Sequence, residues 1–141
     1  MFVLDTNVIS ELRKVGDGRA NDNVVTWISS VDAATLYLSV ISLMEIEHGI
    51  LRMERRDPVQ GSRLRVWMNH LVLPEFKDRT LPVDTVVALR CAGLHVPDPR
   101  PERDALIAAT ALTHGMALVT RNVADFRAMG VPLLNPWEKD P

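Results

Sequence analysis

The sequence has a single cysteine and no long hydrophobic run, and these shortages exclude disulfide bonds within the chain and membrane-spanning helices. One cysteine, Cys91, rules out an intrachain disulfide bond. The apolar, helix-like segment around it, residues 87–92, favours a buried structural thiol over a reactive one. No apolar stretch approaches the roughly 20 residues that a membrane-spanning helix needs. Because Met1 leads straight into an apolar segment, with no basic region before it, we expect a cytoplasmic protein without a membrane partner.

Net charge is also small. The formal charge is −2 and the isoelectric point is about 6.1. Such a chain does not coat nucleic acid nonspecifically, so metal ions and a few local arginines would have to hold a nucleic-acid substrate. Of the 141 residues, 47% are hydrophobic and 24% charged, which is typical of a folded globular protein. The length predicts one domain, residues 1–141, which can form a hydrophobic core without disulfide bonds or structural metals to hold it together.

Several catalytic motifs of α/β proteins are missing. There is no glycine-rich nucleotide loop and no nucleophile elbow, which argues against a nucleotide cofactor and a Ser–His–Asp hydrolase. A haloacid-dehalogenase-like phosphatase needs a second aspartate two residues after the first, but Asn7 stands two residues after Asp5. A response-regulator receiver needs a lysine after a late strand, and the lysines at positions 14, 77 and 139 do not follow one.

What the sequence does contain is a regular alternation of short apolar strands and helical segments. The predicted strands are residues 2–4, 36–40, 80–83, 117–120 and 131–134. The predicted helices are residues 5–14, 24–31, 42–53, 58–73, 84–94 and 104–112, with a short helix from 122. Strands that alternate with helices predict an α/β protein in which a parallel sheet carries helices on both faces.

Four acidic residues follow strands or begin helices: Asp5, Glu45, Asp104 and Asp125. Taken singly, each has a structural interpretation as a cap, a first-turn acid or a turn residue; Glu45 completes a capping-box pattern with Ser42. Taken together, they are predicted to meet, because strand-to-helix junctions of a parallel sheet share one edge. Converging carboxylates need a cation, and their oxygens favour Mg²⁺ or Mn²⁺. Such a cluster can activate water for attack at phosphorus.

Four segments together resemble the signatures of PIN-domain proteins. They are Leu4-Asp5-Thr6-Asn7, Ser42-Leu43-Met44-Glu45, residues 104–111 and residues 118–126, and the closing Leu134-Asn135-Pro136-Trp137 is similar as well. Order and spacing agree over essentially the whole chain, with VapC and FitB ribonuclease toxins as the most similar members. The resemblance implies a three-layer α/β/α sandwich and Mg²⁺- or Mn²⁺-dependent cleavage of RNA by the toxin of a type II toxin–antitoxin pair. It also implies an antitoxin partner, and a homodimer or a toxin–antitoxin hetero-oligomer.

The resemblance also implies roles for individual residues. The expected catalytic and metal-binding residues are Asp5, Glu45, Asp104 and Asp125. The fourth position stays open between Asp125, which we favour, and Asn122. The residues expected to orient these ligands are Thr6, Asn7, Thr120 and Asn122. Two other functions stay open: a housekeeping PIN nuclease in RNA processing or DNA cleavage, and an inactive PIN domain that binds RNA or serves as a scaffold.

Apolar residues of two helices exceed what a small sheet needs. They are Val24, Trp27, Ile28 and the apolar stripe of residues 43–53. Part of this surface is expected to form a groove for an antitoxin helix. The alternative is that these side chains only pack on the sheet.

Overall fold

The computed structural model describes all 141 residues and arranges them as one sheet between two helical layers. The strands are β1 (Phe2–Leu4), β2 (Leu36–Ser39), β3 (Thr80–Leu81), β4 (Ala117–Val119) and β5 (Leu133–Leu134). The α-helices are α1 (Thr6–Leu12), α2 (Asp22–Ser30), α3 (Val40–Arg56), α4 (Pro58–Trp67), α5 (Leu73–Glu75), α6 (Thr85–Leu94), α7 (Glu102–Thr113) and α8 (Val123–Phe126). Shorter turns are η1 (Val15–Asp17), η2 (Ala33–Thr35), η4 (Arg127–Met129) and the π-helical η3 (Met68–Val72).

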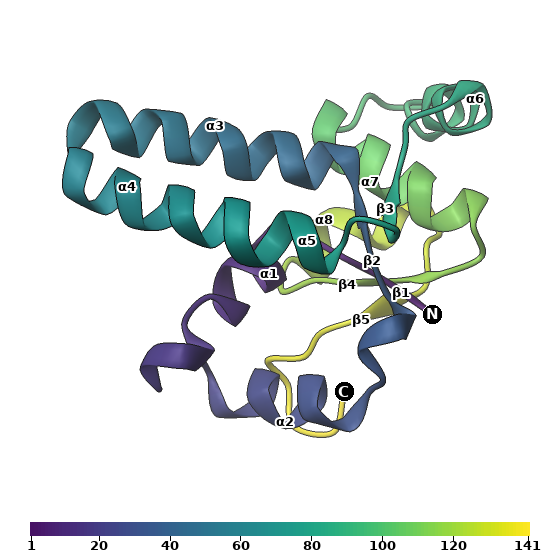
Figure 1. Cartoon of the computed structure of the whole chain (residues 1–141). Helices are drawn as coiled ribbons and strands as arrows, with labels where there is room; N and C mark the ends of the chain where they lie inside the picture. The colour runs from purple at the N-terminus through teal and green to yellow at the C-terminus, as the bar shows by residue number, and fades with distance from the viewer.

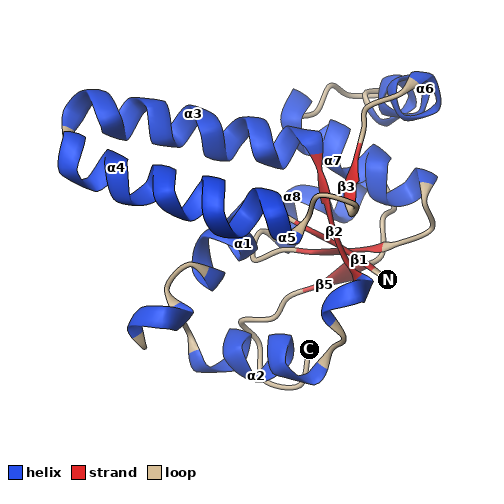
Figure 2. Ribbon diagram, in the orientation of Figure 1, coloured by secondary structure: helices blue, strands red, loops and turns tan.

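All strand pairs in the sheet are parallel, and the strand order is β3-β2-β1-β4-β5. The first strand is therefore the central one, and its Val3 and Leu4 are fully buried, one toward each face. The chain builds outward from β1 to β3 on one side and then adds β4 and β5 on the other (Figure 2). The order thus reverses between β1 and β4, and ligands of open α/β sheets bind beyond the carboxyl ends of the strands at such a point.

Two apolar layers hold helices on the two faces of the sheet. One layer joins β1 and β2 to α1, α2, α3 and η3, with Ile9, Ile50 and Met68 among its buried members. The other joins β1 and β4 to α7 and α8, with Ile107 and Phe126 buried. The helices α3 and α4 run antiparallel and extend beyond the sheet, whereas α6 packs on α7 (Figure 1). The predicted α/β/α sandwich with a central parallel sheet is confirmed.

No helix in the structure combines the length and the apolar character that crossing a membrane requires.

The structure corrects three predicted helix boundaries. The helix expected from Ser42 begins at Val40, because Ser39 is the cap and its Oγ accepts the Ile41 amide at 3.1 Å. Ser42 is instead buried inside α3, and its Oγ has no hydrogen-bond partner. The predicted capping box between Ser42 and Glu45 is therefore wrong, and Glu45 lies in the second turn of α3.

The other two corrections concern Pro74 and Asp104. The helix predicted over residues 58–73 stops just before Pro74, but the chain stays helical to Glu75. The π-helical turn before Pro74 makes it part of the first turn of α5, where a missing N–H breaks no helical hydrogen bond. The helix expected from Asp104 begins two residues earlier, at Glu102, so Asp104 is an acid of its first turn.

Candidate functional site

Asp5 lies at the end of β1, beside the point where the strand order reverses. It caps α1: its Oδ1 accepts the Thr6 amide at 2.8 Å. Its Oδ2 accepts the hydroxyl of Thr120, at the end of β4, also at 2.8 Å. Burial raises the pKa of Asp5, the bonds from Thr120 and Thr6 oppose this, and the charges of Glu45 and Asp125 add to the rise. Asp5 is thus a buried carboxyl that other carboxylates make harder to ionise.

Glu45 reaches the same place from α3. Its Oε1 accepts the Thr6 hydroxyl at 2.7 Å, so Thr6 bonds Asp5 through its amide and Glu45 through its side chain. Arg103 Nη1 lies 3.9 Å from Glu45 Oε2. Among the four acids, only Glu45 has a basic side chain within 4.0 Å.

Asp104 and Asp125 complete the group. Asp104 is partly buried in the first turn of α7, and Asp125 is exposed in the first turn of α8. Burial, followed by the charges of Asp5, Asp125 and Glu45, raises the pKa of Asp104 from 3.8 to about 6. The charges of Glu45 and Asp125 contribute to the raised pKa of both Asp5 and Asp104, so these carboxylates lie close enough to interact. The structure therefore brings the four acids together at one edge of the sheet.

The neighbouring polar residues bond to this group to different degrees. Thr120 is fully buried, and its Oγ1 accepts the Asn122 amide at 3.0 Å while its hydroxyl donates to Asp5. Asn7 Nδ2 donates to Asp5 Oδ2 and to Thr120 Oγ1, both at 3.4 Å. The side chain of Asn122 is exposed and does not cap α8. Thr6, Asn7 and Thr120 therefore contact the acids directly, and Asn122 does so only through Thr120.

The donor set fits a hard divalent cation. It consists of carboxylate oxygens, which are the ligands that Mg²⁺ and Mn²⁺ prefer. Only one of the four carboxylates, that of Glu45, has an arginine nearby. No three of the four acids have ligand atoms that all lie within 4.8 Å of one another. This spread suits an ion that binds one or two carboxylates directly and keeps several waters, as Mg²⁺ does.

Two arginines at the rim were not predicted individually. Arg103 lies next to Asp104 in the sequence, and its approach to Glu45 depends on how α7 crosses α3. Arg121 follows β4; its amide donates to Asn7 Oδ1 at 3.4 Å, and its guanidinium lies 5.3 Å from the centre of the Trp137 ring. The general expectation of local arginines pointed to such residues, but only the fold selects these two.

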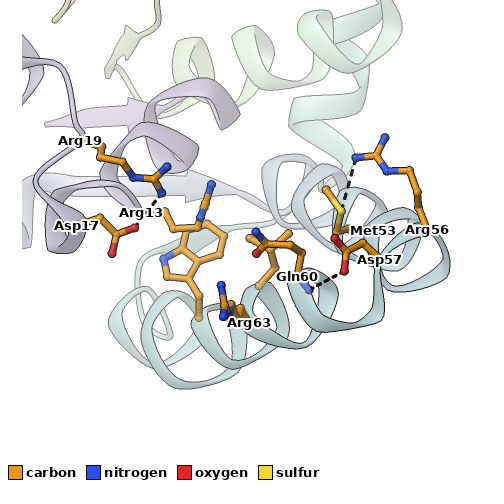
Figure 3. A pocket seen from close by; sticks show the side chains of 10 residues that line it. Arg13, Asp17, Arg19, Met53, Arg56, Asp57, Gln60 and Arg63 are labelled. Carbon is orange, nitrogen blue, oxygen red and sulfur yellow. Dashed lines mark hydrogen bonds and ion pairs between the residues drawn. The ribbon is translucent and has the colours of Figure 1, made fainter.

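Only part of the surface expected to form an antitoxin groove is buried. Val24 and Trp27 are buried in the core, so they pack on the sheet, as in the alternative. Met53, at the end of the apolar stripe of residues 43–53, lines an open pocket between the end of α1, η1 and the α3–α4 pair (Figure 3). It is lined by Arg13, Asp17, Arg19, Met53, Arg56, Asp57, Gln60, Arg63, Leu64 and Trp67. None of the four acids lines it.

A smaller apolar pocket adjoins this one, because Trp67 lines both. Its other lining residues are Ile9, Leu12, Leu71, Val72, Glu75 and Phe76. Leu71 is 62% exposed. An apolar hollow on the surface thus continues into an arginine-rich one.

Comparison with known proteins identifies the fold family. The PIN domain model matches residues 2–131. The chain is 38% identical to VapC ribonuclease Y4jK of Sinorhizobium fredii, over 98% of this chain and 99% of that protein. It is 33% identical to Toxin FitB of Neisseria gonorrhoeae, over 97% and 99% of the two chains. The crystal structure of FitAcB from Neisseria gonorrhoeae superposes with a TM-score of 0.87 at 32% identity, covering 98% of this chain and 99% of that one. The chain belongs to the PIN-domain family.

Proposed function

We propose that this protein is an Mg²⁺- or Mn²⁺-dependent endoribonuclease and the toxin of a type II toxin–antitoxin pair. The observation that carries the proposal is the group of four carboxylates beside the reversal of strand order, with little positive charge nearby. Two similar proteins are named as a ribonuclease and a toxin, which supports the choice of RNA and of the biological role.

The residues divide the work as follows. Asp5 and Asp104 would hold the ion, and Glu45 and Asp125 would complete its surroundings; the ion would supply an activated water and neutralise charge at phosphorus. Thr120 and Thr6 orient the Asp5 carboxylate through their 2.8 Å bonds. Arg103, whose guanidinium lies 3.9 Å from Glu45, suits a phosphate beside the scissile bond. No side-chain nucleophile is needed.

A cleavage assay tests the proposal. The wild type should cut RNA with Mg²⁺ or Mn²⁺ and lose this activity in excess chelator. Asp5→Asn and Asp104→Asn should abolish cleavage, whereas Asp78→Asn, at an exposed aspartate in the turn before β3, should not. Undiminished cleavage in excess chelator, by protein free of contaminating nuclease, would refute the mechanism.

Parallel assays separate the alternative functions. Cleavage of DNA instead of RNA, or growth unaffected by induction, would favour a housekeeping PIN nuclease. RNA binding without cleavage would favour an inactive domain. Sequencing of cellular RNA ends after brief induction, for the wild type against Asp5→Asn, would identify the target.

The proposed partner is an antitoxin whose docking segment carries apolar side chains followed by acidic ones. The structures of similar proteins include FitAB bound to IR36 DNA and other toxin–antitoxin complexes. The joined pockets around Trp67 offer an apolar hollow for the anchoring side chains and arginines 13, 19, 56 and 63 for the acids. We also keep the expectation of a homodimer or hetero-oligomer, which light scattering of the free toxin and of the complex would test.

Substitution of one exposed leucine tests the docking site. Leu71→Asp should weaken binding to the antitoxin encoded beside this gene by at least tenfold, because a buried charge replaces an apolar anchor. Leu89→Asp is the matched control, since Leu89 is 70% exposed but lies on α6. Equal binding by Leu71→Asp and the wild type would exclude this groove.

A further inference from the structure

Three metal-binding side chains meet where α6 ends and α7 begins. Cys91 lies on α6, His95 directly follows it, and Glu102 begins α7. The distances are 3.9 Å from Cys91 Sγ to His95 Nε2, 3.8 Å from Sγ to Glu102 Oε1, and 3.1 Å from Nε2 to Glu102 Oε2. In no other group of three such residues in the chain do the ligand atoms approach within 4.8 Å of one another. We call these three residues the Cys–His–Glu cluster.

We propose that the Cys–His–Glu cluster is a second metal site, which binds Zn²⁺ through three side chains and a water molecule. Around a tetrahedral Zn²⁺ with a Zn–S bond of about 2.3 Å and Zn–N and Zn–O bonds of about 2.0–2.1 Å, ligand atoms lie roughly 3.3–3.6 Å apart. The three separations in the protein, of which the two to Glu102 end on different oxygens of its carboxylate, differ from these values by only a few tenths of an ångström. Rotation of the exposed Glu102 carboxylate would present one oxygen to the metal.

The ligand types separate this site from the four acids. A thiolate and an imidazole select zinc-like transition metals over Mg²⁺, whereas the four acids offer only oxygen. Glu102 and Asp104 are two residues apart, and side chains at that spacing point to different faces of a helix. The proposed site also has an entrance, since the side chain of Glu102 is 70% exposed while Cys91 is buried.

Metal binding requires a defined movement of protons. The Arg100 amide donates to His95 Nδ1 at 3.0 Å, so the neutral ring carries its proton on Nε2 and donates it to Glu102. When Zn²⁺ binds at Nε2, the ring proton moves to Nδ1 and the Arg100 bond breaks. The thiol of Cys91 releases its proton to solvent. The bonds of His95 to Arg100 and Glu102, and that of Cys91 to Glu102, are thus exchanged for three metal bonds.

The consequence for the fold is a cross-link between α6 and α7. Cys91 belongs to a small apolar cluster with Val87, Ala105 and Ala109 that joins the two helices. A metal bound to Cys91 and Glu102 would fix the first turn of α7. This turn carries Asp104, one of the four acids, and Arg103, which lies near Glu45. Zn²⁺ should therefore raise the melting temperature of the protein whether or not RNA is cleaved.

Cobalt titration tests the proposal directly. The full chain, freed of metal and kept reduced without added thiol, is titrated with Co²⁺ in saturating Mg²⁺, which occupies the acids. We expect one equivalent to bind with a thiolate-to-cobalt charge-transfer band, and Zn²⁺ to displace it. His95→Gln and Glu102→Gln, both at the surface end of the cluster, should bind at least tenfold more weakly. His114→Gln, at an exposed histidine after α7, is the matched control and should bind as the wild type does.

Nuclear magnetic resonance supplies a second measurement, which would not change if His95 had only a structural role. Zn²⁺ should shift the His95 ring nitrogens and the Arg100 amide, because coordination at Nε2 protonates Nδ1. Any one of three results would overturn the proposal. The charge-transfer band could be absent, the His95→Gln and Glu102→Gln variants could bind metal with wild-type affinity, or Zn²⁺ could bind without shifting the His95 nitrogens.

Discussion

Asp104→Asn should stabilise the metal-free protein at neutral pH, and the size of the gain follows from the pKa. The folded carboxyl has a pKa of about 6 against an ordinary value of 3.8. Well below pH 3.8 it is protonated in both the folded and the unfolded state and costs nothing. As the pH rises from about 4 through about 6, the folded protein holds its proton while the unfolded chain loses it, so the contribution of this group to the free energy of unfolding is lost.

The full shift corresponds to about 3 kcal/mol, since each tenfold change in proton affinity is worth about 1.4 kcal/mol. Because Asp104 is only partly buried, water screens the repulsion, and we expect about 1–2 kcal/mol, or about 3–6 °C in melting temperature. An amide has nearly the shape of the protonated acid and cannot ionise. The variant should therefore melt like the wild type at about pH 3, below the unfolded pKa, and above it at about pH 7.5.

Melting curves in chelator at these two pH values measure the effect, with Asp78→Asn as a control at an exposed aspartate. Mg²⁺ at a hundredfold excess over its dissociation constant should add about 2.7 kcal/mol to the wild type and less to Asp104→Asn. If the difference in melting temperature between the wild type and the variant does not change with pH, the raised pKa of Asp104 is refuted. Equal stabilisation of both proteins by Mg²⁺ would show that Asp104 is not a metal ligand.

Five further substitutions test individual contacts of the structure. Asp125→Ala should reduce RNA cleavage more than Asn122→Ala, because only a carboxylate supplies charge to a divalent ion; equal activity of Asp125→Ala and the wild type would reverse the assignment. Thr120→Val should lower the free energy of unfolding by about 1–3 kcal/mol in urea titrations, because the buried Asp5 carboxylate loses a donor; an unchanged value would mean that water replaces the hydroxyl. Gly61→Ala should destabilise by about 1–3 kcal/mol, since its Cβ would overlap the Glu54 backbone. Gly49→Ala, on α3 with open space around it, should gain up to about 1 kcal/mol; similar changes in the two would contradict the close contact of α3 and α4.

The sequence predicts the sheet and the meeting of the acids because both follow from local patterns and one topological rule. Apolar runs mark β1 and β4 directly, and parallel strands place the residues after them at the same edge. The first residues of the helices were harder to predict, since Ser39 and Ser42 are equally good caps by residue type. The choice depends on where β2 ends: Ser39 still pairs with Leu81 in the sheet, so its side chain is free to cap α3.

Tertiary contacts explain what the sequence did not predict. Trp27 and Leu71 are both apolar residues of helices, but packing over the sheet buries the first and leaves the second exposed. The approach of Arg103 to Glu45 depends on the crossing of α7 and α3, which no local pattern encodes. The Cys–His–Glu cluster depends likewise on how a proline-rich loop returns α7 to the end of α6.

The hydrogen bond between Thr120 and Asp5 joins residues that are 115 positions apart. During synthesis, β1 is made long before β4, its second neighbour in the sheet, can pair with it. Asp5 can therefore meet Asp104 and Asp125 only after residues 102–126 have been made. A growing polypeptide with this topology lacks the complete group of four acids until β4 has joined the sheet.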